Sequence, residues 1–196
     1  MEDKELVNRI RNGDHHAFTV LIRNTERLVA QIVFKMIGNA EDRRDIAQDV
    51  YLKAYKNIPL FKFKSKLSTW IAQIAYNTCL NHLEKKKLVF PENEHRENEA
   101  RQSTLEDLAD QSADLNDNET LKNIFSSQRS ELLKLAVNKL PAVYQILITL
   151  FHYQELSYEE IAQITGLPDG TVKNYLFRAR KSLKDEILLH YKKEDL

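Results

Sequence analysis

The stretch from Leu156 to Leu183 constrains the fold of this chain more than any other segment. Ser157 and Glu160 form a capping box, in which the hydroxyl accepts from the amide of Glu160 and the carboxylate accepts from the amide of Ser157. Gly166 offers the left-handed residue that commonly ends a helix, and a new helix is expected to begin near Asp169. Two short helices joined through a glycine turn form a helix-turn-helix.

The second of these helices has one apolar face and one basic face. The apolar face carries Val172, Leu176, Ala179 and Leu183 at helical spacing. The opposite arc carries Lys173, Asn174, Phe177, Arg178, Lys181 and Lys184. Lys and Arg reach phosphates or guanine edges, Asn pairs with adenine, and an aromatic ring can contact a thymine methyl. We therefore expect duplex DNA to bind here; a basic helix that lies at a surface or in a partner's groove is the alternative.

Composition extends the helical prediction to the whole chain. The 196 residues include only four Gly and four Pro, and long stretches are rich in Leu, Ile, Ala, Lys and Glu. Residues 1–90 are predicted to form a bundle of helices, with a turn at Asn12-Gly13-Asp14 and later helices over about 40–57 and 68–87. Helical periodicity resumes near Leu121, and Pro141 opens a helix that runs to about Tyr153. The expected fold is all-α, with two small helical domains.

The charges are distributed in blocks, although the 29 basic and 29 acidic side chains cancel. Residues 60–87 and 170–184 are basic, and residues 88–129 between them are acidic and polar. This pattern predicts two sites for a polyanion and a connector that stays away from it; three ordinary solvated surfaces are the alternative. Because residues 91–118 carry few bulky apolar side chains, we expect a flexible or partly helical linker there.

Several classes of protein are disfavoured. A single cysteine, Cys79, excludes an internal disulfide framework and favours a cytoplasmic location. The N-terminal residues do not resemble a signal peptide, and no run approaches the roughly 18 apolar residues that span a bilayer, so we expect no membrane insertion. We find no phosphate-binding glycine loop, nucleophile elbow or metal-ligand cluster, so we expect no enzyme, catalytic residue, metal or cofactor.

Two features of the N-terminal half have open interpretations. Asp42, Asp45 and Asp49 form a stripe on the third helix, which either receives basic side chains from a partner or is a solvated face with an Asp49–Lys53 pair. Taken alone, the residues favour the solvated face.

The fourth helix is predicted to bury one face and to expose aromatic and amide side chains on the other. The buried face carries Leu67, Ile71, Ile74, Ala75 and Thr78. Thr69, Gln73, Tyr76 and Leu80 are expected to face away from the core, with Trp70, Asn77 and Asn81 at the border. Beside the Lys-rich loop at residues 62–66, these side chains could stack on and hold unpaired bases; Trp70 could equally anchor the core.

Taken together, the motifs resemble the bacterial RNA polymerase sigma factors of the extracytoplasmic-function group, over nearly the whole chain. Residues 41–55 are similar to the core-polymerase-binding helix of that family, and residues 65–77 to its promoter-melting helix. Leu140-Pro141 and residues 157–162, 170–173 and 176–180 match its fourth region.

The resemblance implies a division of the chain. Residues 1–90 would be sigma region 2, residues 91–128 a flexible acidic linker along the RNA exit path, and residues 129–193 sigma region 4. The implied partners are core RNA polymerase, through the clamp of its largest subunit and the flap of its second-largest, and promoter DNA, both duplex and melted. The family also suggests an anti-sigma factor as a partner.

The resemblance also implies roles for particular residues. Core polymerase would be bound by Asp42, Asp45, Gln48, Asp49 and Leu52. The minus-ten element would be melted and held by Lys62, Lys64, Lys66, Thr69, Trp70, Gln73, Tyr76, Asn77 and Asn81. The minus-thirty-five element would be read by Tyr158, Glu159, Thr171, Lys173, Asn174, Phe177, Arg178 and Lys181.

Three positions depart from the family pattern. Phe63 stands where the family often has Gly, which concerns the shape of the loop. Tyr175 stands where Arg is usual, so that a phosphate contact at the flank of the recognition helix is missing or is made by a hydroxyl. Asn174 replaces a common Ser, which affects base preference.

The alternative function is a helix-turn-helix regulator that acts without core polymerase. Such a protein usually dimerises and binds a palindrome.

For a sigma factor, the two promoter elements would lie about 16 base pairs apart, or roughly 55 Å at 3.4 Å per pair. A linker of about 40 residues spans roughly 35 Å on average and can extend much further. The linker can bridge the two domains, but polymerase must set their spacing.

Overall fold

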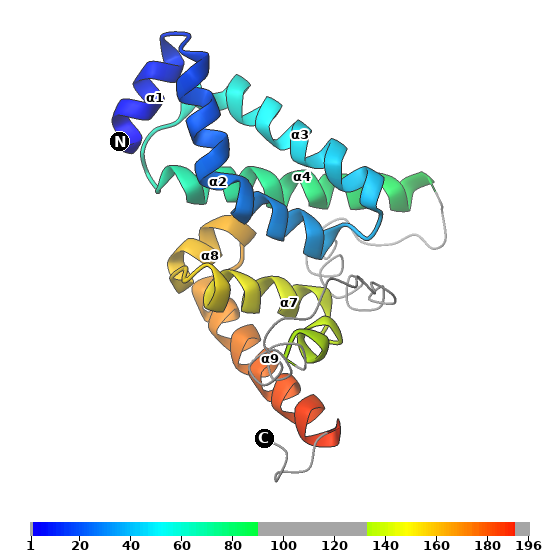
Figure 1. Cartoon of the computed structure of the whole chain (residues 1–196). Coiled ribbons are helices and arrows are strands. Elements are labelled where there is room, and N and C mark those ends of the chain that lie inside the picture. The colour runs from blue at the N-terminus through cyan, green and yellow to red at the C-terminus, as the bar shows by residue number, and fades with distance from the viewer. Residues whose placement is uncertain (1, 90–132, 191–196) are drawn as a thin grey trace, which may run out of the picture.

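The computed structural model describes residues 2–89 and 133–190, which form two groups of helices (Figure 1). The first group comprises α1 (Asp3–Arg11), α2 (His15–Met36), α3 (Ala40–Asn57), the short 3-10 helix η1 (Ile58–Leu60) and α4 (Leu67–Val89). The second comprises α7 (Ala142–Ile148), the π-helical segment η2 (Thr149–Tyr153), α8 (Tyr158–Thr165) and α9 (Asp169–His190). No strand occurs in the described ranges, and the all-α expectation is confirmed.

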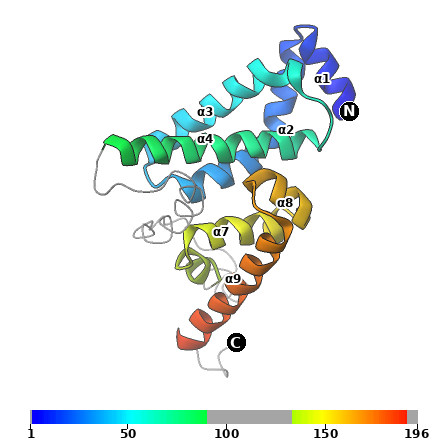
Figure 2. The same ribbon diagram turned by 180° about the vertical axis from the view of Figure 1, so that it is seen from behind.

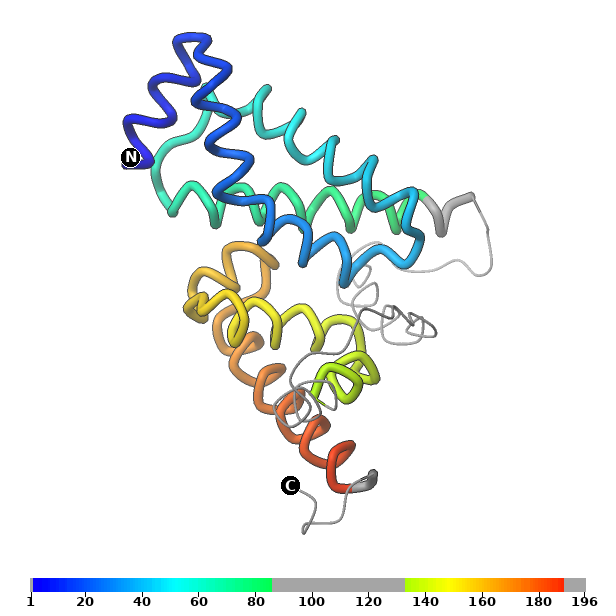
Figure 3. Tube along the Cα trace, in the orientation of Figure 1, coloured from blue at the N-terminus to red at the C-terminus, as the bar shows by residue number. Residues whose placement is uncertain are grey.

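Polar side chains begin the helices of the first group where the sequence predicts it. Gly13 has φ of +83°, and the chain reverses between α1 and α2 (Figure 3). Asp14 then caps α2 by accepting from the amide of Ala17 at 3.0 Å. Asn39 caps α3 by accepting from the amide of Glu41 at 2.8 Å. These caps satisfy amides that have no partner inside the helix, so they fix the helix starts.

The core of the first group lies where α2 and α4 pack together and α3 covers both. Leu21, Ile32, Val50 and Ile71 are buried there, at 2% exposure or less. α4 contacts α2, α3 and α8, so that three helices surround it. The arc that α4 buries is therefore wider than the stripe of a helix on the edge of a bundle.

This wide arc corrects part of the sequence prediction for α4. Thr69 and Tyr76, which were expected to face away from the core, are only 1% and 2% exposed. Ile74, expected to be buried, is half-buried. Gln73 is exposed as expected, and Asn77 and Asn81, which were expected at the border, are exposed along the same strip of the helix. Burial also raises the pKa of the Tyr76 phenol well above its ordinary value.

The second group packs α9 against α7 and α8. Val172, Leu176 and Ala179 of α9 have no exposed surface, and Leu183 is half-buried. The predicted helix from Pro141 to Tyr153 has the expected extent, but its last five residues widen into the π-helical segment.

The two groups touch each other through α8 on α4 and α7 on α2 (Figure 2). Among the described residues, polar contacts between side chains also cross the boundary. Lys66 Nζ lies 2.9 Å from Glu160 Oε1, and Lys35 Nζ donates to Asn138 Oδ1 at 2.7 Å. Gln154 Nε2 donates to Gln31 Oε1 at 2.5 Å. The predicted linker at residues 91–128 lies outside the described residues.

Candidate nucleic-acid interface

The helix-turn-helix predicted from residues 156–183 is present as α8, a short turn and α9. Both hydrogen bonds of the capping box form: Ser157 N donates to Glu160 Oε2 at 2.9 Å, and Glu160 N donates to Ser157 Oγ at 3.2 Å. Gly166 ends α8 with φ of +73°, and α9 begins at Asp169. Because the cap and the glycine fix both ends of α8, they also fix the angle at which α9 leaves the turn.

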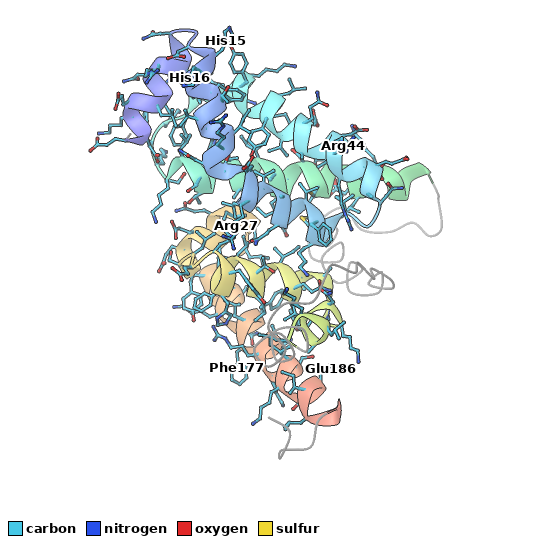
Figure 4. All side chains as sticks on the ribbon, in the orientation of Figure 1. His15, His16, Arg27, Arg44, Phe177 and Glu186 are labelled. Carbon is cyan, nitrogen blue, oxygen red and sulfur yellow. The ribbon has the colours of Figure 1, made fainter. Side chains whose placement is uncertain are left out.

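α9 exposes a polar and basic face opposite its buried residues. Lys173, Asn174, Phe177, Arg178 and Lys181 are all exposed. Phe177 is 67% exposed and projects away from the helix into solvent (Figure 4). An aromatic ring in that position contributes nothing to the core, so its place among cations and an amide favours contact with a base.

The start of α8 borders this face. Tyr158 is half-buried, with its ring stacked on Phe151 at a centroid distance of 5.0 Å. Glu159 is exposed, and hydrogen bonds at the helix start, to its own amide and to Ser157, hold the pKa of its carboxyl below the ordinary value. An ionised carboxylate accepts hydrogen bonds and repels phosphate, so its suitable DNA partner is the amino group of cytosine. Thr171 is half-buried near the start of α9.

Tyr175 does not lie on the exposed face. Its ring meets Tyr144 of α7 edge-on at 6.0 Å, and it is half-buried. The sequence predicts that a phosphate contact here is missing or is made by the Tyr175 hydroxyl, and this stays a prediction. In the structure, the Tyr175 ring packs α9 against α7.

A second surface lies at the loop before α4. Phe63 has φ of +56°, a left-handed conformation that glycine adopts most readily. Phe61 packs its ring against Phe63 at 4.9 Å and against Trp70 at 5.0 Å. The loop is therefore closed by aromatic contacts, and Trp70 is partly a core-edge residue and partly exposed.

Arg11 holds this loop from α1, and local sequence patterns gave no sign of it. Its guanidinium donates to the carbonyls of Ile58, Pro59 and Phe61, at 3.3, 3.2 and 2.7 Å. Asp3 of α1 likewise caps α4, since its carboxylate accepts from the amide of Leu67 at 2.9 Å. Both contacts join residues about fifty or more positions apart, so no periodicity or capping motif could reveal them.

The loop, the start of α4 and Gln163 of α8 line a partly open cavity of about 410 Å³. Its lining is formed by Leu60, Phe61, Lys62, Lys64, Ser65, Thr69, Trp70, Gln73 and Gln163. Five residues expected at one site therefore meet around one space: Lys62, Lys64, Thr69, Trp70 and Gln73. The Thr69 hydroxyl is buried and has no hydrogen-bond partner among the described residues. Such a group is costly to bury alone, so it is suited to receive a polar ligand.

Other residues expected at the same site lie elsewhere. Tyr76 is inside the core, and Lys66 pairs with Glu160 of α8. Asn77 and Asn81 are exposed one and two turns beyond Gln73, so they extend the surface along α4.

The acidic stripe of α3 is mostly exposed. Asp45, Gln48, Asp49 and Leu52 face solvent, and Leu52 is 53% exposed. Asp49 pairs within the helix with Lys53 at 2.8 Å. Asp42 differs, because it is half-buried and its Oδ2 lies 3.4 Å from His82 Nε2 of α4.

Comparisons with known proteins identify the family. The model of Sigma-70 region 2 matches residues 21–89, and the model of Sigma-70 region 4 matches residues 130–183. The ECF RNA polymerase sigma-E factor of Haemophilus influenzae is 31% identical over 95% of this chain and 96% of its own. This chain is an RNA polymerase sigma factor of the ECF group.

Further relatives span nearly the same length. The RNA polymerase sigma-H factor of Pseudomonas aeruginosa is 30% identical over 93% of this chain and 92% of its own. The ECF RNA polymerase sigma factor SigW of Bacillus subtilis is 30% identical over 94% of this chain and 96% of its own.

Solved structures share the fold. The sigma factor RpoE of Bartonella quintana, in complex with the anti-sigma factor NepR, has a TM-score of 0.62 and 20% identity over 89% of this chain and 98% of its own. CnrH in complex with the cytosolic domain of CnrY has a TM-score of 0.58 and 19% identity, over 93% of this chain and 95% of its own.

Membership of this family settles the general function. A sigma factor binds core RNA polymerase and promoter DNA and directs transcription initiation. A regulator that acts without polymerase is not favoured, because both sigma regions match in the expected order. In the described ranges, no helix is long and apolar enough to cross a membrane. The same ranges hold no group of three His, Cys, Asp or Glu residues that could bind a metal ion.

Proposed function

We propose that this sigma factor contacts promoter DNA through two surfaces and core polymerase through a third. The observation that carries the proposal is the exposed face of α9, where cations, Asn174 and Phe177 lie opposite a fully buried apolar face. This helix would enter the major groove of the minus-thirty-five element. Lys173 and Lys181 would bind phosphates, and Asn174, Phe177 and Arg178 would contact base edges. Glu159, Tyr158 and Thr171 would complete the contact from the start of each helix.

The cavity beside α4 would hold one unpaired base of the minus-ten element. Its volume suits a small planar ligand, Trp70 offers a ring for stacking, and the Thr69 hydroxyl offers an unused hydrogen-bonding group. Lys62 and Lys64 are exposed at its rim and would bind the phosphates of the melted strand. Gln73, Asn77 and Asn81 would follow the strand along α4.

The exposed stripe of Asp45, Gln48, Asp49 and Leu52 would bind the clamp of the largest polymerase subunit. The C-terminal domain would bind the flap of the second-largest subunit. Asp42 would support this stripe through its contact with His82. The protein would act in the cytoplasm without catalytic residues, residues 1–90 and 129–193 serving as the two domains. An anti-sigma factor is a further proposed partner, because the structural relative RpoE is bound to one.

Reconstitution with core polymerase on a promoter library tests the proposal. We expect promoter-specific transcripts from the holoenzyme and no tight site-specific binding by the chain alone. Arg178→Ala should lower protection of the minus-thirty-five element about tenfold, as loss of a base contact does. Arg23→Ala, an exposed arginine on α2, is the matched control. An unchanged footprint with Arg178→Ala would overturn the assignment of α9.

Thr69→Val tests the cavity, because it removes the hydroxyl and keeps the shape. The unfolding free energy should stay equal or rise, since a buried unpartnered group is lost. Promoter opening, followed by permanganate reactivity of minus-ten thymines, should nevertheless fall. Equal opening by the variant and the parent holoenzyme would remove Thr69 from the proposed site.

A further inference from the structure

Two aromatic rings lie between two cations of α9. Lys173 Nζ lies 5.6 Å from the ring centroid of Tyr158, and the Arg180 guanidinium carbon lies 4.9 Å from that of Phe151. The two rings stack on each other at 5.0 Å with 14° between their planes. The order is therefore cation, ring, ring, cation.

Three separate elements build this stack. Phe151 comes from η2, Tyr158 is the first residue of α8, and both cations come from α9. Lys173 and Arg180 are seven residues apart, so they lie on the same side of α9, two turns from each other. That side is the edge of the exposed face that borders the start of α8.

His152 gives Arg180 a second anchor. The guanidinium Nε donates to His152 Nε2 at 3.3 Å, which requires a ring nitrogen without a proton. Burial, and next the nearby Arg180, lower the pKa of His152 and so favour that neutral form. Two independent contacts, one with a ring face and one with a nitrogen, thus hold the Arg180 side chain.

Holding these side chains matters because Lys and Arg are among the most flexible residues at a surface. A long side chain loses rotamer freedom when it binds a phosphate, and this loss weakens binding. A side chain that is already fixed before binding loses less. A ring face is a suitable support, because it attracts the cation without neutralising its charge.

We propose that Phe151, Tyr158 and His152 are positioning residues that hold Lys173 and Arg180 for contact with the DNA backbone of the minus-thirty-five element. Arg180 thereby becomes an additional phosphate-binding residue beside those of the exposed α9 face. This inference rests on the proposed role of α9.

A double-mutant cycle with reconstituted holoenzyme tests the inference. The readout is affinity for a library-selected promoter at several salt concentrations. Arg180→Gln should weaken binding without changing sequence preference and should lower the slope of log affinity against log salt by about 0.9, as for one lost phosphate contact. Phe151→Leu should weaken binding about two- to fivefold, the range of an exposed cation–ring contact. In the Arg180→Gln background, Phe151→Leu should weaken binding much less, because the side chain that Phe151 positions is already gone.

Control variants separate positioning from general stability. Tyr144→Leu removes another half-buried ring of the same domain, one that contacts Tyr175, and should leave binding unchanged. Phe151→Tyr keeps the ring face and should recover most of the affinity lost in Phe151→Leu.

Two results would overturn the inference: full additivity of Phe151→Leu and Arg180→Gln, or an unchanged salt slope for Arg180→Gln. The salt slope of Arg180→Gln can be measured even if Phe151→Leu does not fold, because Arg180 is exposed and its replacement should leave the fold intact. The effect of Arg178→Ala on the footprint tests the role of α9 separately, so failure of the inference is distinguishable from failure of the proposed function.

Discussion

Phe63 shows how one residue can determine the shape of a functional loop. It has φ of +56°, where the side chain of any residue other than glycine is crowded by the backbone. The ring is nevertheless kept in place, since it contacts Phe61 at 4.9 Å and lies under the Arg11 guanidinium at 5.5 Å. The loop thus has the backbone conformation of a glycine loop, and ring packing offsets the cost.

Comparison of Phe63→Gly with Phe63→Ala isolates this backbone effect, because both variants lose the ring. The glycine variant should be more stable by up to about 1 kcal/mol, since only the alanine Cβ is strained. Urea unfolding measures the difference. Ser65 of the same loop has no positive φ, so there the alanine variant should be the more stable one. Equal stability of the two Phe63 variants would contradict the argument.

At the scale of helices, α3 and α4 each separate a buried face from the exposed face that we propose binds a partner. α3 buries Val50 and Ala54 and exposes the stripe from Asp45 to Leu52. α4 buries Thr69 and Tyr76 as well as Leu67, Ile71 and Ala75, and it exposes Gln73 and two asparagines. A residue on such an exposed face can therefore be changed with little effect on folding.

Asp49→Lys tests this separation on α3. Its only described ion pair is with Lys53, and both side chains are largely exposed, so the unfolding free energy should change by less than about 0.5 kcal/mol. Affinity for core polymerase should fall severalfold, because a carboxylate that meets a basic partner is replaced by a cation. Fluorescence titration measures the affinity, with Glu5→Lys on α1 as the exposed control. Equal affinity of Asp49→Lys and the parent would remove this residue from the interface.

At the scale of the molecule, the arrangement of the two groups of helices differs from the one that a promoter requires. The promoter elements lie roughly 55 Å apart, whereas α8 packs directly on α4. Gln163 of α8 also lines the cavity proposed for an unpaired base, and Glu160 contacts Lys66 as a DNA phosphate would. Engagement of both elements through the proposed surfaces would therefore require the two groups to separate.

Charge exchange at this contact tests the separation. Lys66→Glu and Glu160→Lys each place like charges together, so each should increase the radius of gyration measured by small-angle X-ray scattering. The double variant restores opposite charges and should recover part of the increase caused by Glu160→Lys, because the capping bond from the Ser157 amide to Glu160 stays lost. This pair, which is exposed on the Lys66 side only, is worth about 0.5 kcal/mol, so we expect a partial shift in population. Identical radii for all four proteins would show that this pair does not affect closure.

Acid should have the same effect as these substitutions. Burial raises the pKa of Glu160, but hydrogen bonds from the Ser157 amide and Lys66 outweigh it and hold the pKa below its ordinary value of 4.5. The stabilisation from Glu160 is therefore present above pH 4.5 and is lost as the pH falls through the lowered pKa.

Local patterns in the amino-acid sequence predicted most of the helices and the character of α9. The capping box, the glycines and the apolar spacing predicted α3, α4, α8 and α9 closely, and the turn at residues 12–14 separates α1 from α2. These signals act through hydrogen bonds and side-chain neighbours within a few residues, so a local pattern is enough to detect them. For the same reason the exposed basic arc of α9 followed directly from its spacing.

Only the tertiary structure decided which polar and aromatic residues became part of the core. Thr69 and Tyr76 are buried because α2, α3 and α8 together surround α4, and Tyr175 turns inward because α7 supplies Tyr144 as a neighbour. Arg11 reaches the loop before α4 from about fifty residues away. Such contacts depend on which helices meet in space, and a side chain's local sequence carries no record of a distant partner.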